Sequence, residues 1–463
     1  MEKHDFTRGS IASNILNLAI PMTLAQLINV LYNIIDRVYI GRLPHVASHA
    51  LAGVGITFPI ITIVIAFANL IGMGGAPLFS IERGKGNHEK AEEIMGCSFT
   101  LLLLCGIVLT MVTLLFKEPI LYLFGASEVI FSYADDYISI YLLGSVFVMV
   151  SLGMNSFINA QGFGKMGMYT VLIGAILNLV LDPILIFVCD LGVKGAAIAT
   201  VVSQFVSALW VLYFLSGGDT ILKLDRTSLR LKWQTVKDIV TLGMSGFVMS
   251  ITNSIVQIVC NATLQRYGGD IYISVMTVLN SIREVIGMPV SGVTNGSQPV
   301  MSYNYGARCF QRVKKCIRFM TLLCVVYMIF MWLITLAIPD VFLRIFNDDV
   351  MLLEKGIPAV RLYYFGYFMM AFQFCGQSTF VALNKSRQAI FFSLFRKVII
   401  VVPLTLWLPT IPSLGVMGVF LAEPISNFIG GCACYVTMYV SVYRKLPMGK
   451  ASISGREGSD VIQ

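Results

Sequence analysis

Residues 94–116 read IMGCSFTLLLLCGIVLTMVTLLF, a run of 23 residues without Asp, Glu, Lys or Arg. A helix needs about 20 apolar residues to cross a hydrocarbon core about 30 Å thick. Ten comparable runs cover residues 9–35, 43–81, 137–164, 195–218, 239–265, 285–307, 319–339, 362–384, 398–422 and 424–443, and a shorter one covers 166–181. The sequence therefore predicts an all-α polytopic membrane protein with twelve transmembrane helices.

The composition agrees with a surface that faces lipid. Hydrophobic residues make up 57% of the 463 residues, charged residues make up 13%, and the mean hydropathy is +0.79. Soluble proteins carry about 25% charged residues, and one soluble domain could not bury twelve helices that are apolar all round. The first run is too long for a cleaved signal peptide and contains Pro21 and Asn29, so it is interpreted as the first span.

The basic residues set the expected orientation. If the N-terminus is cytoplasmic, 22 of the 33 Lys and Arg residues fall in cytoplasmic segments and six fall in outer loops. This bias follows the positive-inside rule and predicts that both termini are cytoplasmic. It also explains the net charge of +8, because basic loops face anionic headgroups. No nucleic-acid partner is expected, since no nucleic-acid-binding fold is recognisable.

The chain repeats itself at an offset of 222–223 residues. The pattern P-x-x-S-x-x-x-G at 77–84 returns at 299–306, and LGVKG at 191–195 returns as LGVMG at 414–418. Six spans per half make the halves parallel repeats about an axis along the membrane normal, a design typical of transporters. The predicted units are an N-lobe (1–215), a cytoplasmic linker (216–234), a C-lobe (235–445) and a cytoplasmic tail (446–463).

Two acidic residues interrupt the apolar spans of the first half. Asp36 follows Tyr32 by one helical turn, and Asp182 follows Asn178 by the same spacing. A carboxylate in mid-membrane costs on the order of 2.5–3.5 kcal/mol, which favours a functional role. Carboxylates that meet in a dry interior share protons or hold Na⁺. Two structural interpretations stay open: an interfacial Asp36–Arg37 pair, and an amide–carboxylate pair that supports the following proline.

Other polar residues extend this face of the first half. Thr200 and Gln204 lie on the sixth span, and Asn155 lies on the fourth. The second half lacks the pattern, because its seventh span offers Asn253 and Gln257 but no acid. A cation site is therefore predicted in the first half, and whether the second half has one stays open.

The charged residues of the second half have two interpretations. Arg283 stands beside Glu284 in the eighth span, where the two form either a functional or a structural pair. Arg396 and Lys397 are expected near the cytoplasmic end of the eleventh span, with their charged ends extended to the headgroups. Arg283 would then be the one basic residue of a central cleft.

The sequence resembles the multidrug and toxic compound extrusion (MATE) transporters, and most closely their bacterial MepA-like subgroup. The resemblance covers about residues 10–445 and rests on these features: Pro21 in the first span, N-x-x-D-x-x-x-x-G at 33–41, AQG at 160–162, NLVLDP at 178–183 and GAAIAT at 195–200. It implies two six-helix bundles around a central cleft. It also implies an antiporter in the bacterial cytoplasmic membrane that expels amphipathic, often cationic, organic compounds in exchange for H⁺ or Na⁺.

The resemblance also assigns residues to a cation site. The coupling site, for H⁺ or Na⁺, would consist of Asp36, Asn178, Asp182 and Thr200, with supporting groups from Tyr32, Tyr137, Asn155 and Gln204. In some family members protonation bends the first helix at a proline that matches Pro21. Other members use acids on spans 7 and 10, where this chain has glutamines.

The cleft is expected to be apolar and adaptable. The 23 methionines favour a promiscuous binding surface, although for any single Met or Phe simple packing is the common role. Candidate lining residues are Met22, Met154, Asn253, Gln257, Met276, Glu284, Met288 and Phe372.

Three alternatives were weighed against a multidrug antiporter. A flippase or exporter of a lipid-linked or other dedicated amphiphile would need several basic residues in the cleft. A transporter of one dedicated metabolite is compatible with the sequence. An intramembrane enzyme would need a nucleophile–base or metal constellation, which the spans do not offer. No cofactor is expected, and the expected form is a monomer in the bilayer.

Overall fold

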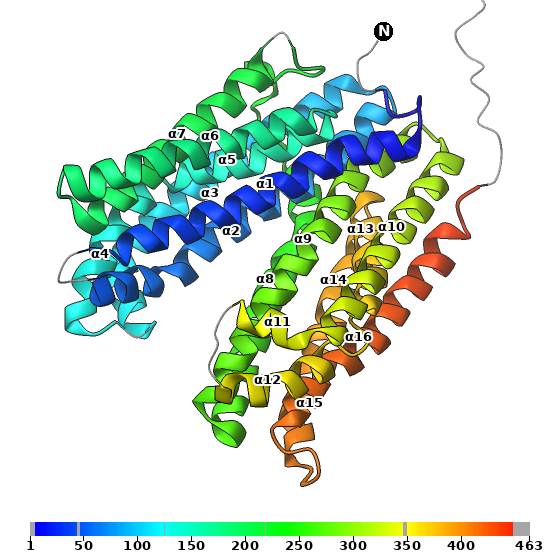
Figure 1. Ribbon diagram of the computed structural model, residues 1–463. Coiled ribbons are helices and arrows are strands. Elements are labelled where there is room, and N and C mark those ends of the chain that lie inside the picture. The colour runs from blue at the N-terminus through cyan, green and yellow to red at the C-terminus, as the bar shows by residue number, and fades with distance from the viewer. Residues whose placement is uncertain (1–4, 44–46, 125, 218, 346–349, 448–463) are drawn as a thin grey trace, which may run out of the picture.

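The computed structural model describes residues 5–43, 47–124, 126–217, 219–345 and 350–447. The regular elements within these ranges are all helical (Figure 1). Ten of the helices are long and apolar enough to cross a membrane, and the bent pair α4–α5 adds an eleventh crossing. The predicted polytopic all-α fold is confirmed.

The first half of the chain forms α1 to α7. In chain order these are α1 (Ile11–Ile40), α2 (Ala47–Gly84), α3 (His88–Leu123), α4 (Glu128–Leu143), α5 (Ser145–Ala160), α6 (Gly164–Pro183), the π-helical turn η1 (Ile184–Val188) and α7 (Gly192–Ser216). α1 continues without interruption through the buried Pro21.

The second half forms α8 to α16. After the 3-10 turn η2 (Arg226–Ser228) come α8 (Trp233–Gly268), α9 (Asp270–Gly306), α10 (Phe310–Ala337), α11 (Pro339–Arg344), α12 (Val350–Tyr363), η3 (Tyr367–Met369), α13 (Met370–Ala382), α14 (Ser386–Leu394), η4 (Phe395–Val401), α15 (Val402–Trp407), η5 (Leu408–Thr410), α16 (Met417–Met438) and η6 (Tyr439–Tyr443). The division into lobes at 216–234 stays a prediction.

The fourth crossing of each half is broken at the same place in the repeat. α4 and α5 meet at Gly144 with a bend of 54°. The expected span 362–384 is likewise divided between α12 and α13, at Gly366, which adopts a left-handed φ of 73° that favours glycine. Gly144 and Gly366 are separated by 222 residues, the offset of the sequence repeat. This break is why α12 and α13, with 14 and 13 residues, are each too short to cross alone.

The two halves pack against each other through α1, α2, α8 and α9. A Cβ atom on Gly84 would lie 2.0 Å from the carbonyl oxygen of Tyr303, and one on Gly306 would lie 2.0 Å from that of Ile81. Each residue of the first contact is 222 positions from its counterpart in the second. The repeated glycines therefore form two equivalent backbone contacts between α2 and α9, as an axis relating the halves requires.

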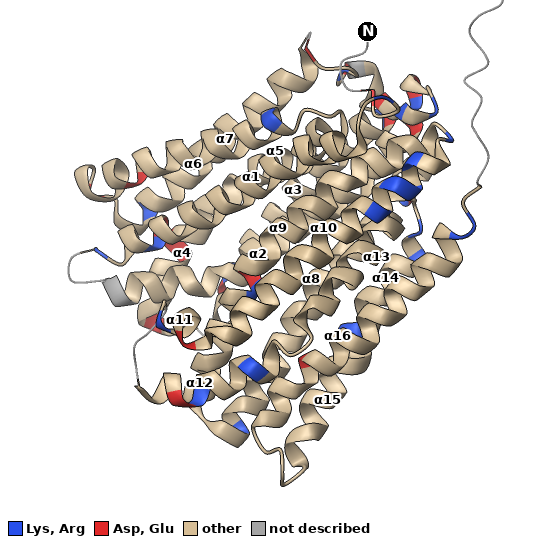
Figure 2. Cartoon of the chain, turned by 45° about the vertical axis from the view of Figure 1, so that its right-hand side comes forward, with Lys and Arg blue, Asp and Glu red and all other residues tan. Residues whose placement is uncertain are grey.

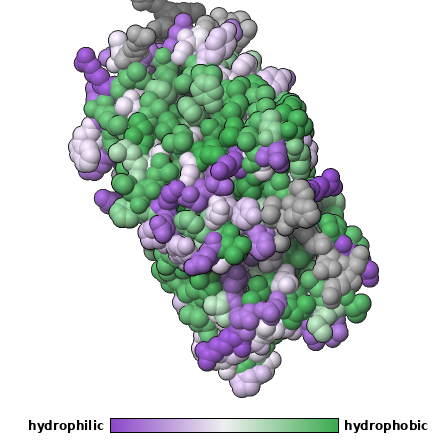
Figure 3. Space-filling model, turned by 90° about the vertical axis from the view of Figure 1, so that its left-hand side faces the viewer, coloured by the Kyte–Doolittle hydropathy of each residue, from purple (hydrophilic) through white to green (hydrophobic). Residues whose placement is uncertain are grey.

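The surface of the protein is suited to lipid. Large apolar side chains face outward, for example Leu115, Val188 and Tyr213, which are 77%, 79% and 76% exposed. Charged residues gather toward the helix ends and leave long uncharged stretches between (Figure 2). The face in Figure 3 shows broad hydrophobic areas with hydrophilic side chains across its middle. Water could not solvate such a surface, whereas hydrocarbon can.

Replacing the repeated glycine of α2 should weaken the contact between the halves. We expect Gly84→Ala to lower the melting temperature of the purified protein in detergent, because overpacking of this kind costs about 1–3 kcal/mol. Gly55→Ala is the matched control in the same helix, since a Cβ there meets nothing within 4 Å. Equal melting temperatures for the two variants would contradict the close contact.

Candidate cation site and central cavity

Asp36 of α1 and Asp182 of α6 face each other inside the first half. Their carboxyl groups lie close enough to interact with each other, and Asp182 is only 1% exposed. Oδ1 of Asp36 and Oδ2 of Asp182 are buried and receive no hydrogen bond from any residue that the structure describes. Two ionised carboxylates repel each other in such a place, so the arrangement favours a shared proton or a bound cation.

Asn178 and Thr200 complete this site. The amide nitrogen of Asn178 donates to Oδ1 of Asp182 at 3.2 Å and to Oγ1 of Thr200 at 3.4 Å. Asn178 and Asp182 share a face of α6 because they stand four residues apart, and α7 brings Thr200 against them. The four predicted coupling residues thus lie together, on three helices. Oxygen ligands of this kind suit H⁺ or Na⁺.

Two tyrosines border the acid pair. Tyr137 of α4 is 4% exposed and lies close to Thr200 and Asp36. Tyr32 of α1 lies close to both Asp36 and Asp182. The guanidinium of the neighbouring Arg37 lies 4.4 Å from the ring centre of Phe58, and its charge also acts on Asp36.

The other predicted supporting residues lie apart from the acid pair. The Asn155 amide donates to the carbonyl oxygen of Gly167 at 3.2 Å, between α5 and the start of α6. Gln204 is half-buried on α7, one turn beyond Thr200. Pro21 lies on α1 at four helical turns from Asp36, so a bend there would act at a distance.

A cavity of about 620 Å³ lies on the side of the second half, where α1 forms part of its wall. Asn253, Gln257, Glu284 and Met288 line it as predicted, and Met276 lines a smaller adjoining cavity of about 100 Å³. The remaining candidates lie elsewhere: Met154 is fully buried in the core, Phe372 packs edge-on against Tyr435, and Met22 is partly buried beside the core.

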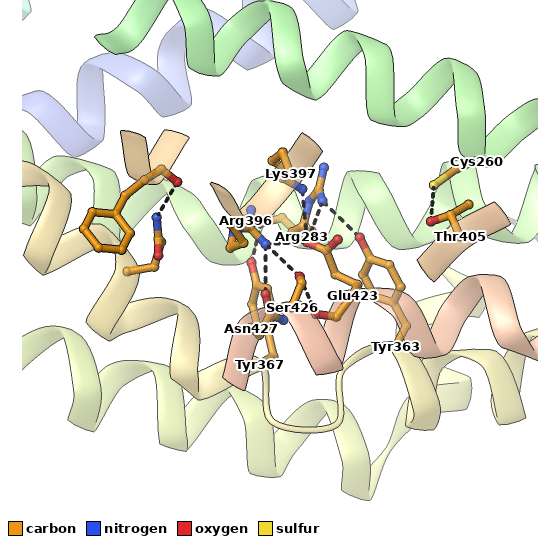
Figure 4. A network of polar contacts seen from close by, with 12 residues as sticks. Cys260, Arg283, Tyr363, Tyr367, Arg396, Lys397, Thr405, Glu423, Ser426 and Asn427 are labelled. Atoms are coloured by element: carbon orange, nitrogen blue, oxygen red, sulfur yellow. Dashed lines mark hydrogen bonds and ion pairs between the residues drawn. The ribbon is translucent and has the colours of Figure 1, made fainter. Parts of the chain in front are cut away.

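The second half contains a buried ionic cluster that sequence reasoning missed (Figure 4). Oε1 of Glu423, on α16, lies 2.9 Å from Arg396, 3.2 Å from Lys397 and 3.5 Å from Arg283. Arg396 also donates to Oδ1 of Asn427 at 2.9 Å. We call Arg283, Arg396, Lys397 and Glu423 the C-half cluster.

Two expectations from the sequence are therefore wrong. Arg396 and Lys397 do not extend to the headgroups: they are 7% and 4% exposed and line the central cavity. Arg283, which was expected to pair with Glu284, instead pairs with Glu423 and donates to the hydroxyl of Tyr363 at 3.0 Å. Arg396 and Lys397 point inward because both lie on the π-helical turn η4, which packs against α16. Such turns recur at functional sites.

Removing the single carboxylate of the C-half cluster should destabilise the protein. We expect Glu423→Gln to lower the melting temperature strongly, because breaking a buried pair costs about 3–5 kcal/mol. Adding Lys397→Met should restore part of the loss, since it removes one of the stranded charges. Glu354→Gln is the control, because that side chain is 69% exposed. A melting temperature unchanged by Glu423→Gln would contradict the cluster.

Comparison with known proteins shows a matching family model and similar relatives. The MatE family model matches residues 21–184 and 247–407. Multidrug export protein MepA of Staphylococcus saprophyticus is 26% identical over 345 residues, which is 74% of this chain and 75% of that protein. MepA of Staphylococcus haemolyticus is 28% identical over 302 residues, 65% of this chain and 66% of that protein.

A solved structure shares the whole architecture. The outward-facing form of a multidrug resistance MATE family transporter of the MOP superfamily superposes with a TM-score of 0.88, at 22% identity over 96% of this chain and 99% of that one. The family model covers more than half of the sequence, and the fold agrees with it. The chain belongs to the MatE family of membrane transporters.

Proposed function

We propose that this protein is a secondary active antiporter of a bacterial cytoplasmic membrane. It exports amphipathic organic compounds, cationic ones among them, in exchange for H⁺ or Na⁺. The observation that carries the proposal is the facing pair Asp36–Asp182, in which one buried oxygen of each acid has no donor among the described residues. Its relatives named MepA are multidrug export proteins, which supports efflux of several compounds by this chain as well.

Helix α1 connects the ion site to the cargo cavity. Gln26, Asn29 and Val30 of α1 line the cavity, and Asp36 lies two turns beyond Asn29 on the same face. α1 packs between α6, which carries Asp182, and α9, which carries much of the cavity wall. A change in the repulsion between Asp36 and Asp182 therefore acts on the helix that borders the cargo.

The exchange cycle follows from the electrostatics of this pair. In the outward-facing state the two carboxylates attract H⁺ or Na⁺, and the bound ion draws α1 and α6 together. The shift of α1 changes the cavity wall and releases cargo outside. The loaded protein then turns inward, loses the ion to the cytoplasm and takes up new cargo. The ion gradient supplies the energy, about 2.3 kcal/mol for one charge moved through 100 mV.

The setting of the transporter is part of the proposal. Both termini would lie in the cytoplasm, on the side of the basic loops. The chain would act as a monomer in the bilayer without a resident cofactor, with small amphipathic molecules as its partners. Glu284 lines the cavity and would meet the positive group of a cationic cargo.

A second candidate is a flippase or exporter of a lipid-linked or other dedicated amphiphile. It requires several basic residues in the cleft, and the cavity is lined by Arg283, Arg396 and Lys397. The structure therefore supports this candidate more than the sequence did, because the sequence predicted Arg283 as the one basic residue of the cleft.

The antiport proposal predicts that both acids are needed for gradient-driven efflux. We expect proteoliposomes with the wild-type protein to move ethidium when a pH or Na⁺ gradient is imposed. Asp36→Asn and Asp182→Asn should each reduce the initial rate about tenfold or more, since an amide neither releases a proton nor attracts a cation as a carboxylate does. The matched control is Asp238→Asn at the start of α8, which should transport at the wild-type rate.

Three outcomes would contradict the proposal. Efflux by both variants at the wild-type rate would reject the assigned ion site. Efflux that requires ATP and ignores both gradients would reject antiport. Movement of a fluorescent lipid between leaflets without any ethidium transport would favour the flippase.

A further inference from the structure

The C-half cluster carries more positive than negative charge. Three basic side chains converge on one oxygen of Glu423 (Figure 4). With all four groups ionised, the cluster has an excess of two positive charges. Glu423, Arg396 and Lys397 are 5%, 7% and 4% exposed, so water screens this excess poorly.

The neighbours of the cluster are neutral. Arg396 donates to the amide oxygen of Asn427 at 2.9 Å and lies 3.5 Å from the hydroxyl of Ser426. Arg283 donates to the hydroxyl of Tyr363 at 3.0 Å. These groups satisfy hydrogen bonds but do not cancel charge. Buried cations without enough counter-charge destabilise a protein, so a second anion would stabilise the cluster.

The excess charge faces a space large enough for a ligand. Arg283, Arg396 and Lys397 all line the 620 Å³ cavity, a volume in the range of small-molecule sites. Glu284 is the only carboxylate among the described residues that line it, and it is exposed. Met249, Met288 and Phe374 add apolar and aromatic surface to the same wall. Arginine and lysine together with apolar side chains fit an amphiphile whose head is a carboxylate or phosphate.

We propose that the C-half cluster is a binding site for the anionic head group, a carboxylate or phosphate, of an amphipathic organic cargo. Resting on the export function proposed above, this assigns anionic and zwitterionic amphiphiles to the transported compounds. The head group contacts Arg283 and Lys397 on the cavity side of Glu423, and its apolar part lies along the methionines of α8 and α9. In a zwitterionic cargo the positive group meets Glu284.

Binding of a matched probe pair tests the site on the full-length protein. N-dansyl-phenylalanine is an amphiphilic carboxylate, and its amide has the same shape without the charge. In phosphatidylcholine nanodiscs we expect the acid to bind about tenfold more tightly than the amide, because a hydrogen bond to an ionised group is stronger than one between neutral groups. Dansyl fluorescence measures both affinities without any ion gradient, so the result is independent of antiport.

Variants locate the binding site. Arg283→Gln and Lys397→Gln should each lower the affinity for the acid about tenfold and leave that for the amide unchanged. Arg361→Gln, an exposed arginine of α12, is the control and should bind as wild type does. If either cluster variant folds poorly, the difference in affinity between the acid and the amide on the wild-type protein still tests the proposal.

Two competition arms identify the source of the anionic group. Displacement of the acid by phenyl phosphate supports a free organic anion as cargo. Displacement by phosphatidylglycerol built into the nanodisc supports a lipid head group in the same site. Equal binding of acid and amide to the wild-type protein would overturn the proposal. The proposal would also be overturned if both cluster variants bound the acid as tightly as the wild-type protein does.

Discussion

A charge in the hydrocarbon interior must be neutralised from within the protein or by something that enters it. The fold obeys this constraint along nearly its whole length, because its spans contain few charges and the basic residues gather in the connecting segments. Within the part of the chain that the structure describes, the fold departs from the constraint at two clusters. The acid pair of the first half has too much negative charge, and the C-half cluster has too much positive charge.

Helix α1 borders both of these places. Asp36 lies beside Asp182 of α6, and Asn29, two turns earlier on the same face of α1, lines the cavity. Each site also lies beside a π-helical turn: η1 follows Asp182 and Pro183, and η4 contains Arg396 and Lys397. A wider turn changes which way consecutive side chains point, which is how two adjacent cations reach one carboxylate. Small cations and anionic head groups would then bind at separate sites, and binding at one site would affect the other through α1.

Sequence reasoning found the spans and the acid pair but not the C-half cluster. Asp36 and Asp182 stood out because each interrupts an apolar run, and the four-residue spacing placed Asn178 beside Asp182. Gly144 and Gly366 share the repeat offset, so the broken fourth crossing could have been predicted. The cluster was missed because Arg396 was placed near the cytoplasmic end of its span, with its charge extended to the headgroups, although the span continues to Thr410. The usable signal was Glu423, a lone acid between two apolar runs opposite two cations on the preceding span. No pattern in the sequence predicts that η4 is a π-helical turn, since tertiary packing decides it.

The most direct measurement of the central claim is infrared difference spectroscopy of the carboxyl groups in the purified protein. At neutral pH without Na⁺, the account predicts one carboxylic acid band from a proton shared by Asp36 and Asp182. That band should disappear on adding Na⁺ if Na⁺ competes for the pair, and it should be altered in both Asp36→Asn and Asp182→Asn. A spectrum in which both carboxylates are ionised and Na⁺ changes no carboxylate band, or a band that neither variant changes, would show that the pair does not hold the coupling ion.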